Sequence, residues 1–302
     1  TVTINQAAGQ VDPTSTSPIN FTVTFSEPVT GFANADINLT GTAGATTVLV
    51  TGGPTTYNVS VSGMKGSGTV TPFVFVNAAQ DAASNSSFAS TSSDNTVTFD
   101  NTPLTVTINQ DAGQSDPTGT APINFAVIFN KPINSATFTG VDVDLTGSTA
   151  PGTLTAVITG SGSTYNVAVS GMTGSGTVVA TIPVGSVQDI AANSNLASTS
   201  VDNIVTFDAT APSVTVNQSS LQADPTNGMP INFTVVFSEA VTGFTSADVL
   251  TTGSTAPGTL TANVTGGGTT YNVAISSMTD SGTVVVTVPA GAAIDVSNNG
   301  NT

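Results

Sequence analysis

The sequence predicts an all-β protein built from three tandem sandwiches that follow one another in a linear rod. A pattern that recurs three times sets this architecture: TVTINQ at 1–6 returns at 105–110 and, as SVTVNQ, at 213–218. The repeated segments alternate apolar and polar residues with period two, as in INFTVTF at 19–25, which is typical of half-buried strands. No stretch shows the spacing or the capping pattern of a helix.

The three copies of the pattern cover the whole chain and define its expected domains. We place the first repeat at 1–102, the second at 103–210 and the third at 211–302. Each repeat is long enough to bury a core of its own. The connections at 100–103 and 208–212 are short and contain proline, which favours a semi-rigid rod over a loose string of domains.

Seven short strands are expected in each complete repeat. In the first repeat they lie near 1–6, 19–26, 36–41, 46–52, 56–62, 68–76 and 95–100. Seven antiparallel strands in about 105 residues favour an immunoglobulin-like sandwich.

The third repeat lacks the last strand of this set. It ends before a counterpart of NTVTFD at 95–100 and NIVTFD at 203–208. One interpretation is that the array continues beyond Thr302. The other is that the third sandwich accepts a strand from a neighbouring subunit, which would build a filament by strand addition.

The charge balance excludes several classes of function. There are 18 acidic residues and only two basic ones, Lys65 and Lys131, for a net charge of −16. Nucleic acids and anionic membrane surfaces need clustered Lys and Arg, so we expect neither as a partner. No apolar run is long enough for membrane insertion. Without His, Cys or Arg the usual nucleophile and base pairs cannot form, and we expect no enzyme.

Three motifs carry a resemblance to a known family. FSEPVTGF at 25–32, DAASN at 81–85 and DATAP at 208–212 resemble the bacterial immunoglobulin-like repeats of large surface adhesins and extracellular filament or matrix proteins. The resemblance implies a structural segment of an extracellular or cell-surface filament or stalk, whose partners are neighbouring copies of itself or further repeats of the same chain. Adhesin repeats that bind a surface ligand, or passive spacers in a secreted enzyme, are the alternatives.

The acidic residues raise the question of calcium, because two lysines cannot neutralise them. If the sandwiches stack end to end, the loops at one pole and the linker carboxylates should meet at each junction. At the second junction the expected ligands are Asp116, Asp208, Glu239, Asp248, Asp295 and Asn299. The corresponding set in the first repeat is Glu27, Asp36, Asp81 and Asn85. Calcium takes six to eight hard oxygen ligands in flexible geometry. The alternative is that each residue is a turn former bonded to its local backbone.

Lys131 distinguishes the first junction from the second. Alignment of FNKP at 129–132 with FSEP at 25–28 places this lysine where the other repeats carry Glu27 and Glu239. At the first junction its ammonium group could therefore replace a metal ion and pair with Asp100, Asp142 or Asp189. The alternative is an exposed lysine of little consequence.

Overall fold

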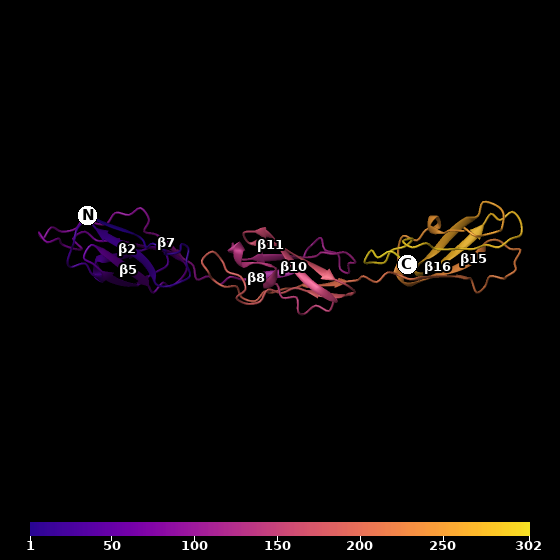
Figure 1. The fold of residues 1–302 in the computed structure, drawn as a ribbon, viewed down its shortest axis with the longest axis horizontal. Coiled ribbons are helices and arrows are strands. Elements are labelled where there is room, and N and C mark those ends of the chain that lie inside the picture. The colour runs from indigo at the N-terminus through magenta and orange to yellow at the C-terminus, as the bar shows by residue number, and fades with distance from the viewer.

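A computed structural model describes residues 1–302. Figure 1 shows three β-rich bodies in single file along the long axis of the molecule, joined by single chain crossings. The alternation of apolar and polar residues produces this all-β fold, because it gives every strand one face to bury. The only helices are four 3-10 turns, η1 (Asn34–Asp36), η2 (Ser135–Thr137), η3 (Gly140–Asp142) and η4 (Ser246–Asp248).

The first repeat forms two antiparallel sheets, one with strand order β1-β2-β5-β4 and one with order β3-β6-β7. Its strands are β1 (Val2–Gln6), β2 (Ile19–Phe25), β3 (Ile37–Thr40), β4 (Thr47–Gly52), β5 (Thr56–Ser62), β6 (Gly68–Val74) and β7 (Val97–Phe99). Each lies within a segment in which a strand is expected from the sequence.

The second repeat has the same layout with one strand fewer than expected. Its sheets have the orders β10-β11-β9-β8 and β12-β13. The strands are β8 (Val106–Gln110), β9 (Ile123–Phe129), β10 (Gly152–Ser161), β11 (Thr164–Met172), β12 (Gly176–Val179) and β13 (Ile204–Phe207). The counterpart of β3 is reduced to a single bridge between Asp144 and Thr181, because the chain turns away after it.

The third repeat departs furthest from seven strands. It has one three-stranded sheet, in the order β14-β15-β16, formed by β14 (Val214–Gln218), β15 (Ile231–Val241) and β16 (Thr261–Ser276). β16 spans two expected strands, since Gly268 within the turn still pairs with Val241. A counterpart of β7 and β13 is absent, and the segment that would pair with it, 282–288, forms no strand.

Each repeat has its own hydrophobic core. The buried clusters contain 19, 20 and 10 residues in the first, second and third repeats, and none of them crosses a junction. In the first core, Phe25, Phe32 and Tyr57 pack edge to face, with ring centroids 5.0–5.8 Å apart. Since no core spans two repeats, the polar contacts at the junctions have a large part in setting how the bodies are oriented.

Candidate cation site at the second junction

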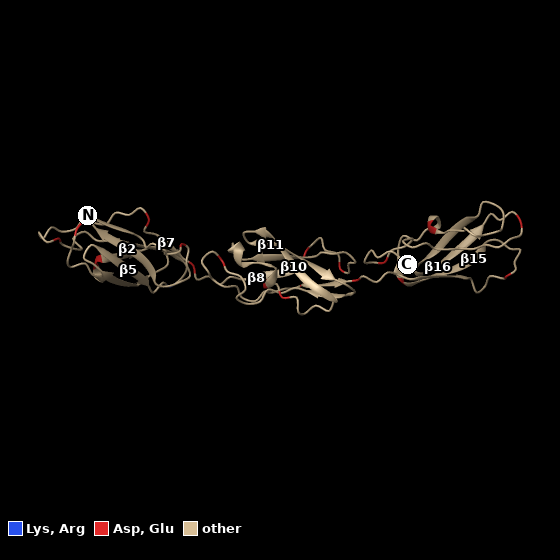
Figure 2. Ribbon diagram, in the orientation of Figure 1, with Lys and Arg blue, Asp and Glu red and all other residues tan.

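Most acidic residues lie outside the strands, in loops, linkers and 3-10 turns (Figure 2). Among the strands only β15 contains one, Glu239. A five-residue loop with Asp first and Asn last occurs at the same pole of each repeat, at 81–85, 189–193 and 295–299. In each loop the Asp carboxylate accepts bonds from the backbone N–H and the side-chain amide of the Asn four residues later.

The backbone of this loop explains its sequence. Its fourth residue, Ser84, Ala192 or Asn298, has a positive φ of 65–67° in all three repeats. That conformation is uncommon for residues with a Cβ, and the bonds to the first Asp hold it in place. The loop is therefore a preformed support that presents one carboxylate and one amide toward the preceding repeat.

At the first junction this loop binds the linker and a lysine. Asn193 Nδ2 donates to the carbonyl of Asp100, 2.9 Å away. Lys131 Nζ lies 2.8 Å from Asp100 Oδ2, 2.5 Å from Asp189 Oδ2 and 2.7 Å from the carbonyl of Thr102. One ammonium group thus joins the carboxylate of the linker to that of the second repeat.

These contacts change the ionisation of the groups. Burial opposes the charge of Asp100, but hydrogen bonds from Lys131 and Thr102 outweigh it and lower the pKa to about 2. Burial likewise opposes the charge of Asp189, whose side chain is 2% exposed, yet bonds from Lys131 and Asn193 lower its pKa. The pKa of Lys131 is raised, since its bonds to the two carboxylates outweigh its burial.

The second junction repeats this framework with related residues. Asn299 Nδ2 donates to the carbonyl of Asp208 at 2.9 Å, as Asn193 does to that of Asp100. The backbone N–H of Gly119 donates to the Ser297 carbonyl at 2.9 Å, and Ser297 Oγ donates to Asp208 Oδ2 at 3.2 Å. The same kinds of contact between neighbouring repeats therefore occur at both junctions.

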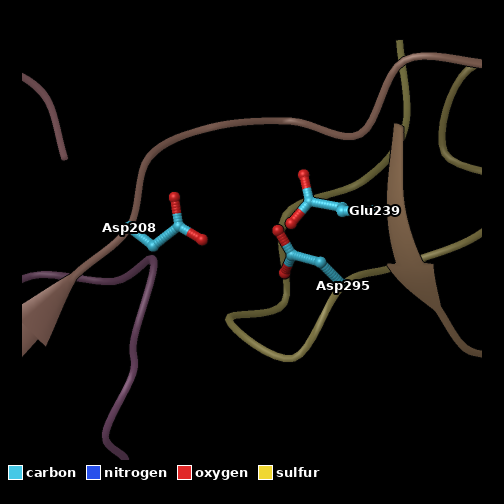
Figure 3. A group of neighbouring side chains, drawn as sticks. All are labelled: Asp208, Glu239 and Asp295. Atoms are coloured by element: carbon cyan, nitrogen blue, oxygen red, sulfur yellow. The ribbon is translucent and has the colours of Figure 1, made fainter. Parts of the chain in front are cut away.

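The difference between the two junctions is the residue at the centre. Glu239 occupies the place of Lys131, so Asp208, Glu239 and Asp295 each bring a carboxylate oxygen within 4.8 Å of the others. Figure 3 shows the carboxylates of Glu239 and Asp295 beside each other and facing that of Asp208 across the junction. Asp295 is 3% exposed. Three negative groups thus converge where the first junction has two carboxylates and one ammonium.

The surroundings of Glu239 change the ionisation of its carboxyl group. Its pKa is raised by burial and by the charges of Asp295 and Asp208. The pKa of Asp208 is lowered, chiefly by the backbone N–H of Thr210. Hard oxygen ligands of this kind suit calcium, and a bound divalent cation would replace the repulsion around Glu239 with attraction.

Other residues of the expected set stay outside the group. Asp116 Oδ1 accepts the backbone N–H of Thr206 at 2.9 Å, which ties it to its own repeat. Asp248 Oδ2 accepts from the backbone N–H and the hydroxyl of Thr245, and so caps η4. Asn299 lies beside the group: its amide N–H groups donate to the Asp208 carbonyl and the Asp295 carboxylate, and these bonds do not use its Oδ1, the atom that would bind a metal ion. The carboxylates of Asp116 and Asp248 therefore accept hydrogen bonds within their own repeats.

Residues of the first-repeat set are divided in the same way. Glu27, Asp81 and Asn85 line one open hollow of about 160 Å³. Asp36 accepts the backbone N–H of Ala33 at 2.8 Å and is not part of that hollow. At the first junction Lys131 does not contact Asp142, which caps η3 by accepting from Thr139.

Two contributors to the second junction were not expected from the sequence. Ser297 is 1% exposed and binds Asp208, although the other loops have alanine at this position, so no repeated pattern marks it. Gly119 approaches so closely that a Cβ there would lie 2.5 Å from Asn299 Oδ1 and 2.8 Å from the Ser297 carbonyl. In the sequence, the glycine itself is the signal that could have indicated this close approach of two backbones.

Comparison with known families identifies the class of the third repeat. Residues 208–302 match the model of the family described as the bacterial Ig-like domain. The match confirms the resemblance to bacterial immunoglobulin-like repeats. Domains of this family are typical of bacterial surface proteins and are typically non-catalytic. No curated protein matches the chain. None of its helices has the length and apolarity to span a bilayer.

Proposed function

We propose that the chain is a structural segment of an extracellular or cell-surface stalk or filament, in which tandem Ig-like sandwiches form a rod and calcium stiffens the second junction. Repetition of one junction framework supports the rod, because each meeting of two repeats uses the same loop, linker carbonyl and carboxylates. The short linkers leave little free chain between these contacts.

The observation that carries the calcium proposal is the exchange of Lys131 for Glu239 in an otherwise equivalent site. At the first junction two carboxylates are joined by a positive group that the chain itself supplies. At the second junction the third carboxylate takes that place, and in this proposal a cation from solution supplies the positive charge. Asp208, Glu239 and Asp295 would hold it, with carbonyl oxygens and water completing the shell.

Calcium fits this donor set better than magnesium. The three carboxylates offer oxygen ligands only, and they come from two parts of the chain, the linker and the third repeat. Calcium accepts variable coordination geometry, whereas magnesium demands a strict octahedron and holds its water. A bound ion contacts both repeats, so it stabilises their relative orientation as well as the third repeat.

The test is a calcium titration of the chain after chelation, followed by calorimetry and by thermal unfolding. We expect one calcium site of moderate affinity, a rise in the unfolding temperature of the third repeat, and a much weaker response to magnesium. Glu239→Gln should weaken calcium binding at least about tenfold. Glu27→Gln is the matched control, since it alters the equivalent residue away from the junction. No calcium response at millimolar concentration would contradict the calcium part of the proposal and leave the rod untouched.

A further inference from the structure

A serine in a loop of each of the first two repeats contacts the linker that leaves the same repeat. In the first repeat, the pairing of β6 with β7 places Ser67 next to Asp100, the first residue of the linker. In the second repeat, the pairing of β12 with β13 places Ser175 next to Asp208. The register of the last strand pair therefore brings a serine hydroxyl to the start of each linker.

The hydroxyl group of Ser175 makes three contacts, all with the second linker. Its oxygen accepts the backbone N–H of Ala209 at 2.9 Å. It lies 3.1 Å from Asp208 Oδ1, and it donates there because a carboxylate only accepts. The hydroxyl of Thr210 is 2.9 Å away. Since a hydroxyl has one donor and two acceptor sites, Thr210 donates in this pair and every site of Ser175 is used.

Ser67 makes the same contacts with the first linker. Its oxygen accepts the backbone N–H of Asn101 at 2.9 Å. Asp100 Oδ1 and the hydroxyl of Thr102 lie 3.0 and 2.9 Å from it. The side-chain oxygen of Asn101 is also 2.9 Å away, at a position where the second linker has alanine. In both linkers a serine thus contacts an aspartate and a threonine at matching positions.

Each linker carboxylate is divided between its own repeat and the next one. Asp100 Oδ1 accepts from Ser67, and its Oδ2 accepts from Lys131 of the second repeat. In Asp208, Oδ1 accepts from the serine of its own repeat and Oδ2 accepts from Ser297 of the third. A carboxylate whose Oδ1 is held in this way keeps its Oδ2 directed toward the following repeat.

The same contacts restrict the backbone of each linker. The N–H of the residue after the aspartate donates to the serine and has no backbone acceptor. Two residues separate Asp100 from Pro103, and three separate Asp208 from Pro212. Each proline fixes its own φ, so the serine acts on the few residues of the linker that are otherwise free to rotate.

We propose that Ser67 and Ser175 are positioning residues of the rod. Each fixes the direction in which the chain leaves its repeat and directs the linker carboxylate toward the next repeat. This role rests on the rod of the proposed function and is independent of calcium. The serine contacts lie within one repeat and its linker, so they orient the linker whether or not a cation joins the two repeats.

The test measures distances between spin labels on neighbouring repeats of the full chain, in chelator. Labels at Thr3→Cys and Thr107→Cys span the first junction, and labels at Thr107→Cys and Thr215→Cys span the second. We expect Ser67→Ala to broaden the distribution of distances across the first junction at least about twofold and to leave the second unchanged. Ser175→Ala should do the reverse.

Hydrogen exchange supplies a second readout at the second linker. The amide of Ala209 should exchange at least about tenfold faster in Ser175→Ala, because it loses its acceptor. Ser175→Thr keeps a hydroxyl group and should restore both the slow exchange and the narrow distribution. The unfolding temperatures of the repeats should be the same in all these variants, which separates positioning from a loss of stability.

Ser115→Ala is the matched control, since this serine is exposed in the second repeat and its side chain makes no contact with the linker. It should change neither readout. Distributions that stay unchanged in both serine-to-alanine variants of the linker contacts, or that broaden equally in Ser115→Ala, would overturn the proposal. Because chelator is present throughout, failure of this test is distinguishable from failure of the calcium titration.

Discussion

Replacing Glu239 with lysine should convert the second junction into a copy of the first. The ammonium group of Glu239→Lys would enter between Asp208 and Asp295, as Lys131 lies between Asp100 and Asp189. Burial and the repulsion from Asp295 and Asp208 raise the pKa of Glu239; the variant removes this repulsion and supplies a positive charge. The junction would then be held together without metal.

The size of the effect follows from the first junction. There the contacts with Lys131 and its neighbours lower the pKa of Asp100 from 3.8 to about 2. At 1.36 kcal/mol per pKa unit, this corresponds to about 2 kcal/mol of stability at neutral pH. For a domain of this size, about 2 kcal/mol raises the unfolding temperature by roughly 10 °C.

Thermal unfolding of the wild type and of Glu239→Lys, each in chelator and in millimolar calcium, measures the effect. We expect the variant in chelator to unfold about 10 °C above the wild type in chelator, and to gain almost nothing from calcium. Glu239→Gln separates the two causes, because it removes the repulsion but adds no cation, and it should give a smaller rise. A lysine variant that keeps the full calcium response would show that Glu239 is not a calcium ligand.

Four further predictions concern the same junctions. Lys131→Glu should lower the free energy of unfolding in chelator by about 3 kcal/mol, because the buried carboxylate of Asp189 loses its partner. The same variant should create a calcium response at the first junction. Thermal unfolding measures both effects, and Lys65→Glu is the charge-matched control. Acidification should remove the contribution of Asp100 to stability, about 2 kcal/mol, because the pKa of this group is lower in the folded state. The contribution is complete above pH 3.8 and is lost as the pH falls toward 2. Urea unfolding at a series of pH values measures this loss. Glu239 has the opposite sign, because its folded pKa is raised above 4.5, so in chelator lowering the pH toward 4.5 should increase the stability of the third repeat, and the increase should vanish in Glu239→Gln. Gly119→Ala should disturb the second junction alone, and calorimetry should show weaker calcium binding in this variant.

The sequence predicts the strands of the first repeat well, because periodic alternation is a local property and three copies reinforce it. It also places Lys131 opposite Glu239, since that requires only alignment of the repeats. Strand formation in the third repeat could not be predicted in the same way. Segment 282–288 has the composition of a strand, but a strand needs a partner, and no strand within residues 1–302 pairs with this segment.

Convergence of the acidic residues was harder to predict than their recurrence. The structure brings Asp208, Glu239 and Asp295 together, while Asp116 and Asp248 are bonded to their own backbone neighbours. The outcome of such competition depends on the direction of each side chain, which residue type and spacing do not specify. Calcium binding by the three remains a prediction.

Distance measurements across both junctions show whether calcium fixes the orientation of the third repeat relative to the second. The chain has no cysteine, so spin labels can be placed at equivalent exposed positions by Thr3→Cys with Thr107→Cys, and by Thr107→Cys with Thr215→Cys. Pulsed electron spin resonance then gives the spread of distances across each junction. We expect calcium to narrow the distribution of distances across the second junction. The distribution across the first junction should be narrow without calcium and should not change. Equal distributions with and without calcium at the second junction would contradict this expectation.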